Sequence, residues 1–141
     1  FLLMQPDRDR VATARVRDLM DEPSWVLDAP CTPRELMGVL GQARLCLAMR
    51  LHTLIFAARM AVPAMGLVYD PKVASYLEEL DLPAAGDVAH FDGAEAIRRA
   101  DALMENYDQV LARLRKKSAQ LSRAAGENER LLLELLEKTK R

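Results

Sequence analysis

The sequence predicts an α/β protein in which a parallel sheet is flanked by helices and followed by a helical C-terminal tail. Short apolar runs alternate with amphipathic segments over residues 1–104, which is the order expected of strands and crossover helices. Proline, aspartate and threonine stand where the helices should begin. Residues 105–141 show helical spacing only. We therefore divide the chain into a sheet domain, residues 1–104, and a helical extension, residues 105–141.

Composition narrows the classes of protein to which the chain can belong. The 141 residues suffice for one domain with a buried core, half of them are hydrophobic, and the formal net charge is −1. These values indicate neither a disordered chain nor a surface for nucleic acid. Cys31 and Cys46 belong to no CxxC or Cys/His cluster, so we expect reduced thiols in a cytoplasmic protein and no metal site.

The first part of the sheet domain contains two predicted strands. Residues 1–4 form an apolar run, and a helix that opens at Asp7 should follow. The buried face of this helix should consist of Ala12, Val16, Leu19 and Met20. Residues 25–27 predict a short buried strand. Residues 32–35, Thr-Pro-Arg-Glu, carry a helix-start signature: a threonine cap, a proline in the first turn and a glutamate that reaches back to the cap.

Three more strands are predicted in the second part. Residues 45–49 are apolar throughout, as in a strand whose two faces are both covered by helices. The helix over residues 51–61 is apolar on nearly every side and should be buried, and residues 63–69 form the next strand. Residues 87–91 predict a fifth strand, after which Asp92 caps another helix. This order implies right-handed crossovers and a Rossmann-like layer.

The C-terminal extension is predicted to be helical from Asn106 onward, with a break at Gly126. Its far end carries leucines at positions 131–133, 135 and 136. So many leucines on one terminal helix need a partner surface. The candidates are the sheet domain itself, a domain of the same protein outside this sequence, or a second copy of the chain in a homodimer formed through the C-terminal helices.

Arg50 and His52 are the first candidate site residues. They directly follow the predicted strand over residues 45–49 and lie in the first turn of the next helix, where free backbone N–H groups and the helix dipole favour an anion. A guanidinium at that point makes a site for a phosphate or a carboxylate. The alternative is structural: an arginine at the rim of the sheet and a histidine bound to a backbone carbonyl.

Asp70 and Lys72 follow the next predicted strand. Asp70 precedes a proline and is a good helix N-cap. Lys72 meets the positive end of the helix dipole, which opposes a lysine by roughly 0.3–1 kcal/mol unless an anion is shared there. It therefore indicates a negatively charged ligand at the same sheet edge. Gln5 and Asp7 follow the first strand and can face this crevice, whereas His90 has no partner in sequence and is assigned a structural role.

A family resemblance adds to this interpretation. Residues 49–57 (MRLHTLIFA), 62–63 (VP), Gly66 and 69–73 (YDPKV) resemble the signature of polysaccharide pyruvyltransferases, especially the bacterial type linked to S-layer cell-wall polymers. The resemblance extends over roughly residues 1–83. It implies the C-terminal, Rossmann-like half of a two-domain GT-B type fold, with the active site in the cleft between the halves. It also implies transfer of the enolpyruvyl unit of phosphoenolpyruvate to two hydroxyls of a sugar, forming a cyclic ketal.

The resemblance implies roles for the candidate residues. Arg50 and His52 match the family's Arg-x-His element, which is associated with the phosphoenolpyruvate donor. Our hypothesis is that Arg50 clamps an anionic group of the donor, that His52 contacts the phosphate or acts as general acid to it, and that Lys72 helps to hold the donor. Asp70 is either a base toward the sugar or a helix cap, and the cap is the stronger interpretation.

The implied partners are phosphoenolpyruvate as donor substrate, a sugar or lipid-linked glycan as acceptor, and a missing N-terminal domain of the same protein. No further cofactor is implied. The reaction belongs in the cytoplasm or at the inner face of the membrane, and the chain alone should not turn over. Two other functions stay open: a sugar-nucleotide glycosyltransferase domain of the same fold, and a non-catalytic Rossmann-like interaction module. The sequence contains no GxGxxG, P-loop, HExxH or GxSxG motif.

Overall fold

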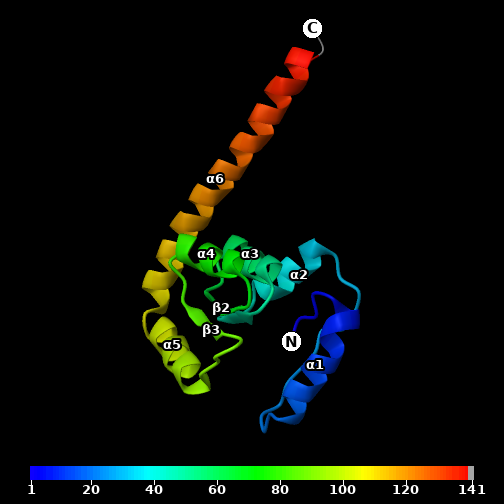
Figure 1. Ribbon diagram of the computed structural model, residues 1–141, viewed down its shortest axis with the longest axis vertical. Coiled ribbons are helices and arrows are strands. Elements are labelled where there is room, and N and C mark those ends of the chain that lie inside the picture. Colours follow the sequence, from blue (N-terminus) through cyan, green and yellow to red (C-terminus); the bar gives the residue numbers. More distant parts are fainter. Residues whose placement is uncertain (140–141) are drawn as a thin grey trace.

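The computed structural model describes residues 1–139 and shows a parallel three-stranded sheet flanked by helices, with a long helix at the C-terminal end (Figure 1). The predicted α/β fold with a parallel sheet is thereby confirmed. The elements in chain order are α1 (Pro6–Asp18), α2 (Pro33–Leu40), β1 (Cys46–Ala48), α3 (Leu51–Arg59), β2 (Ala64–Val68), α4 (Pro71–Glu79), β3 (Ala84–Asp87), α5 (Gly93–Glu105) and α6 (Tyr107–Thr139).

The three strands lie side by side in chain order, β1-β2-β3. Cys46 pairs with Ala64, and Gly66 pairs with both Ala48 and Ala84. The register between β2 and β3 shifts after Gly66. Because all three strands run parallel, their carboxyl ends lie at one edge of the sheet, and the loops that lead into α3 and α4 begin there.

The core forms where α3 and α4 pack on the sheet. Leu54 of α3 and Val73 of α4 are completely buried, and Leu77 is nearly so. Gly66 of β2 makes this packing possible, because a Cβ atom at that position would lie 2.7 Å from the Cδ1 of Leu77. The predicted helix after β1 is confirmed, but only one side of it is buried, through Thr53, Leu54, Ala57 and Ala58; the predicted cap at Asp70 is also confirmed.

The two strands predicted near the N-terminus are reduced to a single parallel bridge between Leu2 and Leu27. The Leu27 N–H donates to the carbonyl of Phe1 at 2.9 Å, and no ladder extends from it among residues 1–139. Trp25 is 79% exposed, so the prediction of a buried strand at residues 25–27 is wrong. The run has only this one bridge as a strand partner, and the contacts of α1 with its two ends are polar, from Arg17 to Ser24 and from Arg10 to Asp28.

Helix α1 begins at Pro6 with Gln5 as its N-cap, and not at Asp7. It contains no buried residue, although a buried stripe was expected on it. That expectation is wrong because α1 lies beside the sheet edge and does not cover a sheet face (Figure 1). Its exposed apolar side chains are Val11, Val16 and Leu19, the last of these next to the helix end.

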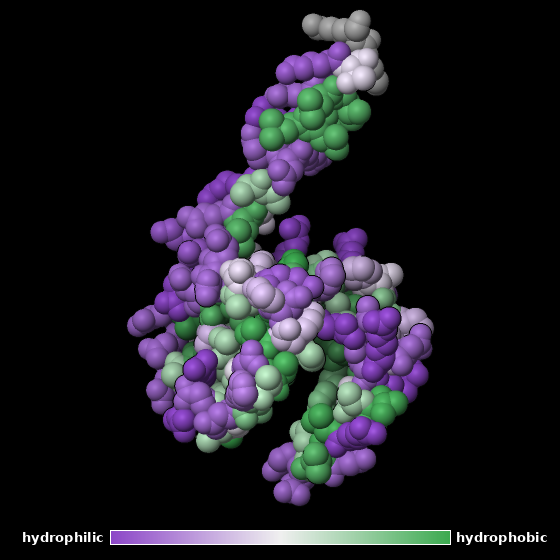
Figure 2. Space-filling view, in the orientation of Figure 1, coloured by the Kyte–Doolittle hydropathy of each residue, from purple (hydrophilic) through white to green (hydrophobic). Residues whose placement is uncertain are grey.

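The first strand of the sheet is covered on one side only. Cys46 and Ala48 are buried against the core, whereas Leu47, between them, is 60% exposed. The expectation that both faces of residues 45–49 are covered is therefore wrong. Between α1 and β1 lies a hollow of about 470 Å³, here called the α1 hollow, and Figure 2 shows the molecule divided beside α1. Its lining includes Phe1, Leu2, Asp9, Leu47, Met49 and Arg50.

Strand β3 ends where a fifth strand was predicted to begin. It spans Ala84–Asp87 and not residues 87–91, so it begins three residues and ends four residues before the predicted strand. The chain turns at Asp87, whose carboxylate accepts from the backbone N–H of Ala89 at 2.7 Å. His90 lies in this turn, and its backbone N–H donates to the carbonyl of Asp87.

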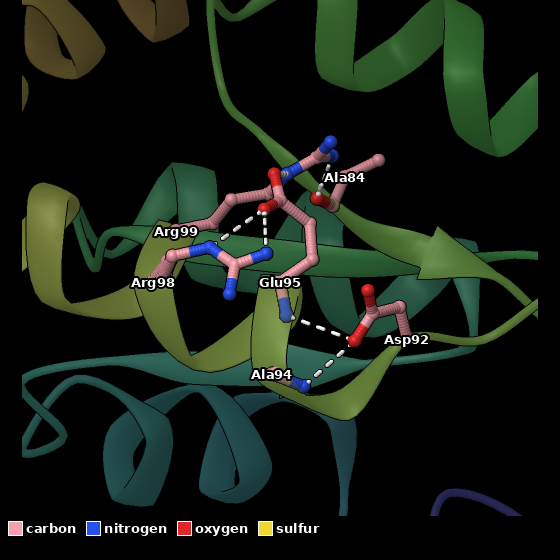
Figure 3. Close-up of polar contacts among 6 residues, drawn as sticks. All are labelled: Ala84, Asp92, Ala94, Glu95, Arg98 and Arg99. Atoms are coloured by element: carbon pink, nitrogen blue, oxygen red, sulfur yellow. Dashed lines mark hydrogen bonds and ion pairs between the residues drawn. The ribbon is translucent and has the colours of Figure 1, made fainter.

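Helix α5 is attached to β3 by a polar network at its start (Figure 3). Asp92 caps the helix as predicted, accepting from the backbone N–H groups of Ala94 and Glu95. Glu95 accepts in turn from Arg98 and Arg99 (Figure 3). Arg99 also donates to the carbonyl of Ala84 at 2.8 Å, which joins α5 to the strand.

Helix α6 runs without a break through Gly126, so the break predicted there is wrong. Its first turns pack on α3 and α5 and bury Val110 and Leu114. The rest of the helix stands away from the body (Figure 1), and Figure 2 shows apolar side chains near its far end. Leu131–Leu133, Leu135 and Leu136 are all exposed there. Within residues 1–139, no helix is both long enough and apolar enough to cross a membrane.

Candidate functional site

The candidate site lies where β1 and β2 lead into α3 and α4. Arg50 is the N-cap of α3 and has extended backbone angles, while its carbonyl accepts from the N–H of Thr53 at 3.0 Å. Asp70 occupies the same position before α4. Since β1 and β2 are neighbours and parallel, the N-termini of α3 and α4 face the same edge of the sheet, and the uncapped one is that of α3.

A hollow of about 660 Å³ opens at this edge, and we call it the Arg50 hollow. It brings together three of the residues predicted from the sequence, Arg50, His52 and Lys72, and it also includes Gln5 from the start of α1. Its complete lining is Met4, Gln5, Cys31, Pro33, Leu36, Arg50, Leu51, His52, Phe56, Tyr69 and Lys72. Asp7 and Asp70 are not among these lining residues, and His90 lies at another hollow beside β3.

Arg50 is held by a two-point ion pair with Asp9 of α1. The Arg50 Nε donates to Asp9 Oδ2 at 3.2 Å, and the Arg50 Nη2 donates to Asp9 Oδ1 at 2.5 Å. Both side chains are partly buried, with 34% of Arg50 and 23% of Asp9 exposed. The hydrogen bond from Arg50 is the main reason why the pKa of Asp9 is lowered, and the same bond raises the pKa of Arg50.

Asp9 was not a candidate in the sequence analysis. It is also held from its own helix, because its Oδ2 accepts from the backbone N–H of Gln5 at 2.9 Å. Forty-one positions separate it from Arg50 along the chain. The only local signal is its place in the first turn of a helix, where an acidic residue is expected in any case.

Lys72 is paired with Asp70. The Lys72 Nζ lies 3.3 Å from Asp70 Oδ2, while Asp70 Oδ1 accepts from the backbone N–H of Lys72 at 3.0 Å. That backbone hydrogen bond is the main cause of the lowered pKa of Asp70. The Lys72 ammonium also lies 5.9 Å from the centre of the Tyr69 ring. The charge that offsets the lysine at this helix start is therefore Asp70, and Lys72 by itself does not require a ligand.

His52 follows Arg50 on the first turn of α3. Its side chain is exposed and lines the Arg50 hollow. Within residues 1–139, no side chain caps the first turn of α3, so this turn presents backbone N–H groups at the hollow. Together with Lys72 and the free edge of the Arg50 guanidinium, these donors form a surface suited to an oxyanion.

The two cysteines differ in their surroundings. Both thiols are free. Cys31 is half-buried and lines the Arg50 hollow, which the sequence analysis did not foresee. Cys46 is buried in β1, and burial raises the pKa of its thiol to about 11. Of the two thiols, only that of Cys31 should therefore react at a rate that depends on whether the Arg50 hollow is occupied. In the part of the chain that the structure describes, no three His, Cys, Asp or Glu side chains are grouped to hold a metal ion.

Comparison with protein families gives a match for this region. Residues 4–71 match the family model described as polysaccharide pyruvyl transferase. This segment begins at the first lining residue of the Arg50 hollow and ends at the first residue of α4, so it contains Asp9, Arg50 and His52. No solved structure matches the chain significantly.

Proposed function

We propose that this chain belongs to the polysaccharide pyruvyl transferase family, whose model matches residues 4–71, and that its Arg50 hollow binds the donor substrate, phosphoenolpyruvate. The observation that carries the proposal is the convergence of Arg50, His52 and Lys72 on one hollow at two helix N-termini. Phosphoenolpyruvate carries a phosphate and a carboxylate, and each needs several N–H donors in a fixed arrangement. The chain would then be the C-terminal, donor-binding half of a GT-B type enzyme.

The proposed reaction joins one pyruvyl carbon to two sugar hydroxyls. Protonation of the methylene carbon makes the neighbouring carbon electrophilic, and the first hydroxyl oxygen bonds to it. The C–O bond to phosphate then breaks, and the second hydroxyl closes the ketal. Of the two hydroxyl protons, one balances the proton added to the methylene carbon and the other leaves with the phosphate.

Each site residue has a role in this scheme. Arg50 holds an anionic group of the donor with the N–H groups that Asp9 does not use. His52 contacts the phosphate or protonates it as it leaves, which its exposed position at the helix start permits. Lys72 turns from Asp70 to the donor. Asp70 acts as the helix cap and not as the base, since its Oδ1 keeps the hydrogen bond from the backbone N–H of Lys72 when the lysine side chain turns away.

The acceptor is proposed to be a sugar of a cell-wall polysaccharide precursor, either free or lipid-linked, as in the S-layer type of the family. A second domain would hold this acceptor opposite the Arg50 hollow. The reaction would then take place in the cytoplasm or at the inner face of the membrane. We expect the 141-residue chain to bind the donor without forming the ketal.

Titration of the intact protein with phosphoenolpyruvate and, separately, with UDP-sugars tests the proposal. We expect phosphoenolpyruvate to bind and the Arg50→Ala variant to bind it at least about tenfold more weakly, because hydrogen bonds to a charged group are lost. Arg10→Ala is the matched control. Arg10 lies on α1 outside the hollow and forms an exposed ion pair with Asp28, so loss of the Arg10 side chain should leave phosphoenolpyruvate binding unchanged. Binding of UDP-sugars alone would contradict the proposal and favour a glycosyltransferase.

A further inference from the structure

We infer that Asp9 is a positioning residue, which holds the Arg50 guanidinium in the orientation that binds the donor. This inference rests on the proposed function, because it assigns a role to a side chain that does not itself line the Arg50 hollow. Arginine has a long and flexible side chain, and Arg50 stands at the open end of the sheet with 34% of its side chain exposed. Without a fixed partner, its guanidinium would have several orientations available.

The geometry of the pair defines one orientation. The Nε and Nη2 atoms of Arg50 meet the two carboxylate oxygens of Asp9 side by side, which fixes the plane of the guanidinium as well as its distance. These two hydrogen bonds use two of the five N–H groups. The remaining three lie on Nη1 and on the outer side of Nη2, and they are the donors available to an anion.

Asp9 lies where it does not compete with the donor for the Arg50 guanidinium. Arg50 lines both the α1 hollow and the Arg50 hollow, whereas Asp9 lines the α1 hollow only. The carboxylate therefore approaches the guanidinium from the side away from the proposed donor. A ligand in the Arg50 hollow can reach the free N–H groups without displacing Asp9.

The Asp9 carboxylate is itself held in place, so it can fix the orientation of the Arg50 guanidinium. Its Oδ2 accepts from the backbone N–H of Gln5, and Gln5 is the N-cap of α1 and lines the Arg50 hollow. The side chain of Asp9 is only 23% exposed, compared with 42% for Asp28 in the other aspartate pair of α1. The ion pair between Asp9 and Arg50 therefore joins α1 to the proposed site.

Donor affinity in the intact protein tests this role. Asp9→Asn removes the charge and one of the two acceptors with almost no change in shape, and we expect it to weaken phosphoenolpyruvate binding about tenfold, because small misorientation of a binding group is costly. Asp28→Asn breaks the exposed pair with Arg10 on the same helix and should leave the affinity unchanged. In an Arg50→Ala background, Asp9→Asn should cause no further loss, since Asp9 acts only through Arg50.

The Arg50 side chain gives a second measurement that does not need a ligand. Its Nε–H signal in NMR spectra should exchange slowly with water in the wild type and quickly in Asp9→Asn. Unchanged or tighter donor binding by Asp9→Asn would overturn the positioning role, and so would an equal loss in the Arg50→Ala background, which would show that Asp9 only supports the helix. Failure of the wild type to bind phosphoenolpyruvate would instead overturn the proposed function, and the inference with it.

Discussion

Arg50 and Lys72 each have a carboxylate partner in the structure, and this arrangement shapes what the Arg50 hollow can bind. Asp9 pairs with Arg50, and Asp70 pairs with Lys72. The charges of the two pairs cancel, so the hollow attracts an anion through the free guanidinium edge and through the uncapped backbone N–H groups at the start of α3. The two pairs differ in exposure, because Lys72 and Asp70 are both more exposed than the residues of the first pair.

Substitution of Asp70 distinguishes its two contacts, the helix-capping hydrogen bond from the Lys72 N–H and the ion pair with the Lys72 ammonium. Asparagine caps a helix about as well as aspartate but carries no charge, so Asp70→Asn should keep the unfolding midpoint and release Lys72. We expect phosphoenolpyruvate to bind about threefold more tightly, which is the order of magnitude for an exposed ion pair. Asp70→Ala should release Lys72 as well but lower the unfolding midpoint, because the cap is lost. A weaker affinity in Asp70→Asn would show that this carboxylate takes part in donor binding.

The sequence predicts part of this site and misses another part for a clear reason. Arg50, His52 and Lys72 can be found because they directly follow apolar strands, and the ends of parallel strands share one edge. Asp9 cannot be found in this way. Its contact with Arg50 depends on how α1 lies beside the sheet, which no local pattern records. Cys31 lines the hollow for the same kind of reason, since it belongs to a loop.

At the scale of elements, α4 and α3 pack closely on β2. Gly66 is the contact point: a Cβ atom there would lie 2.7 Å from Leu77, 3.2 Å from Leu54 and 3.3 Å from Val73. All three of these side chains are buried and have little space to move. The strand therefore supports the start of α4, and with it Asp70 and Lys72, through a position where only glycine fits.

Gly66→Ala should destabilise the protein by about 1–3 kcal/mol, because the added methyl group overfills a packed core. Gly38→Ala is the matched control, since Gly38 lies inside α2 with open space around it and alanine favours a helix. That control should stabilise the protein by about 0.4–1 kcal/mol. Urea unfolding of both variants measures the difference. Equal stability of Gly66→Ala and wild type would show that α4 does not pack as closely as described.

The elements that the sequence predicts well are those with a local chemical signal. The capping box of Thr32 and Glu35 and the caps at Asp70 and Asp92 all form where expected. The strands predicted at residues 1–4 and 25–27 lack such a signal, because an apolar run becomes a strand only if neighbours pair with it and cover it. Leu47 illustrates this, since it lies in a real strand and still faces an open side.

At the scale of the whole molecule, the N-terminal part of helix α6 packs on the rest of the domain, whereas its C-terminal part is exposed. Leu114 is fully buried at the base, whereas the leucines from position 131 onward are about half exposed. Amide hydrogen exchange should therefore be slow over residues 107–121 and near the rate of an isolated helix over residues 122–139. Equal protection along both segments would contradict this and would show that a partner, such as a second copy of the chain, covers the leucines.

The most direct test of the proposed function is the reactivity of Cys31 in the intact protein. Cys31 lines the Arg50 hollow, while Cys46 is buried with a raised pKa and serves as an internal reference that a thiol reagent should label slowly or not at all. We predict that phosphoenolpyruvate slows the labelling of Cys31 several-fold in the wild type, and that Arg50→Ala needs at least about tenfold more phosphoenolpyruvate for the same protection. Labelling of Cys31 at the same rate with and without phosphoenolpyruvate would contradict donor binding in this hollow.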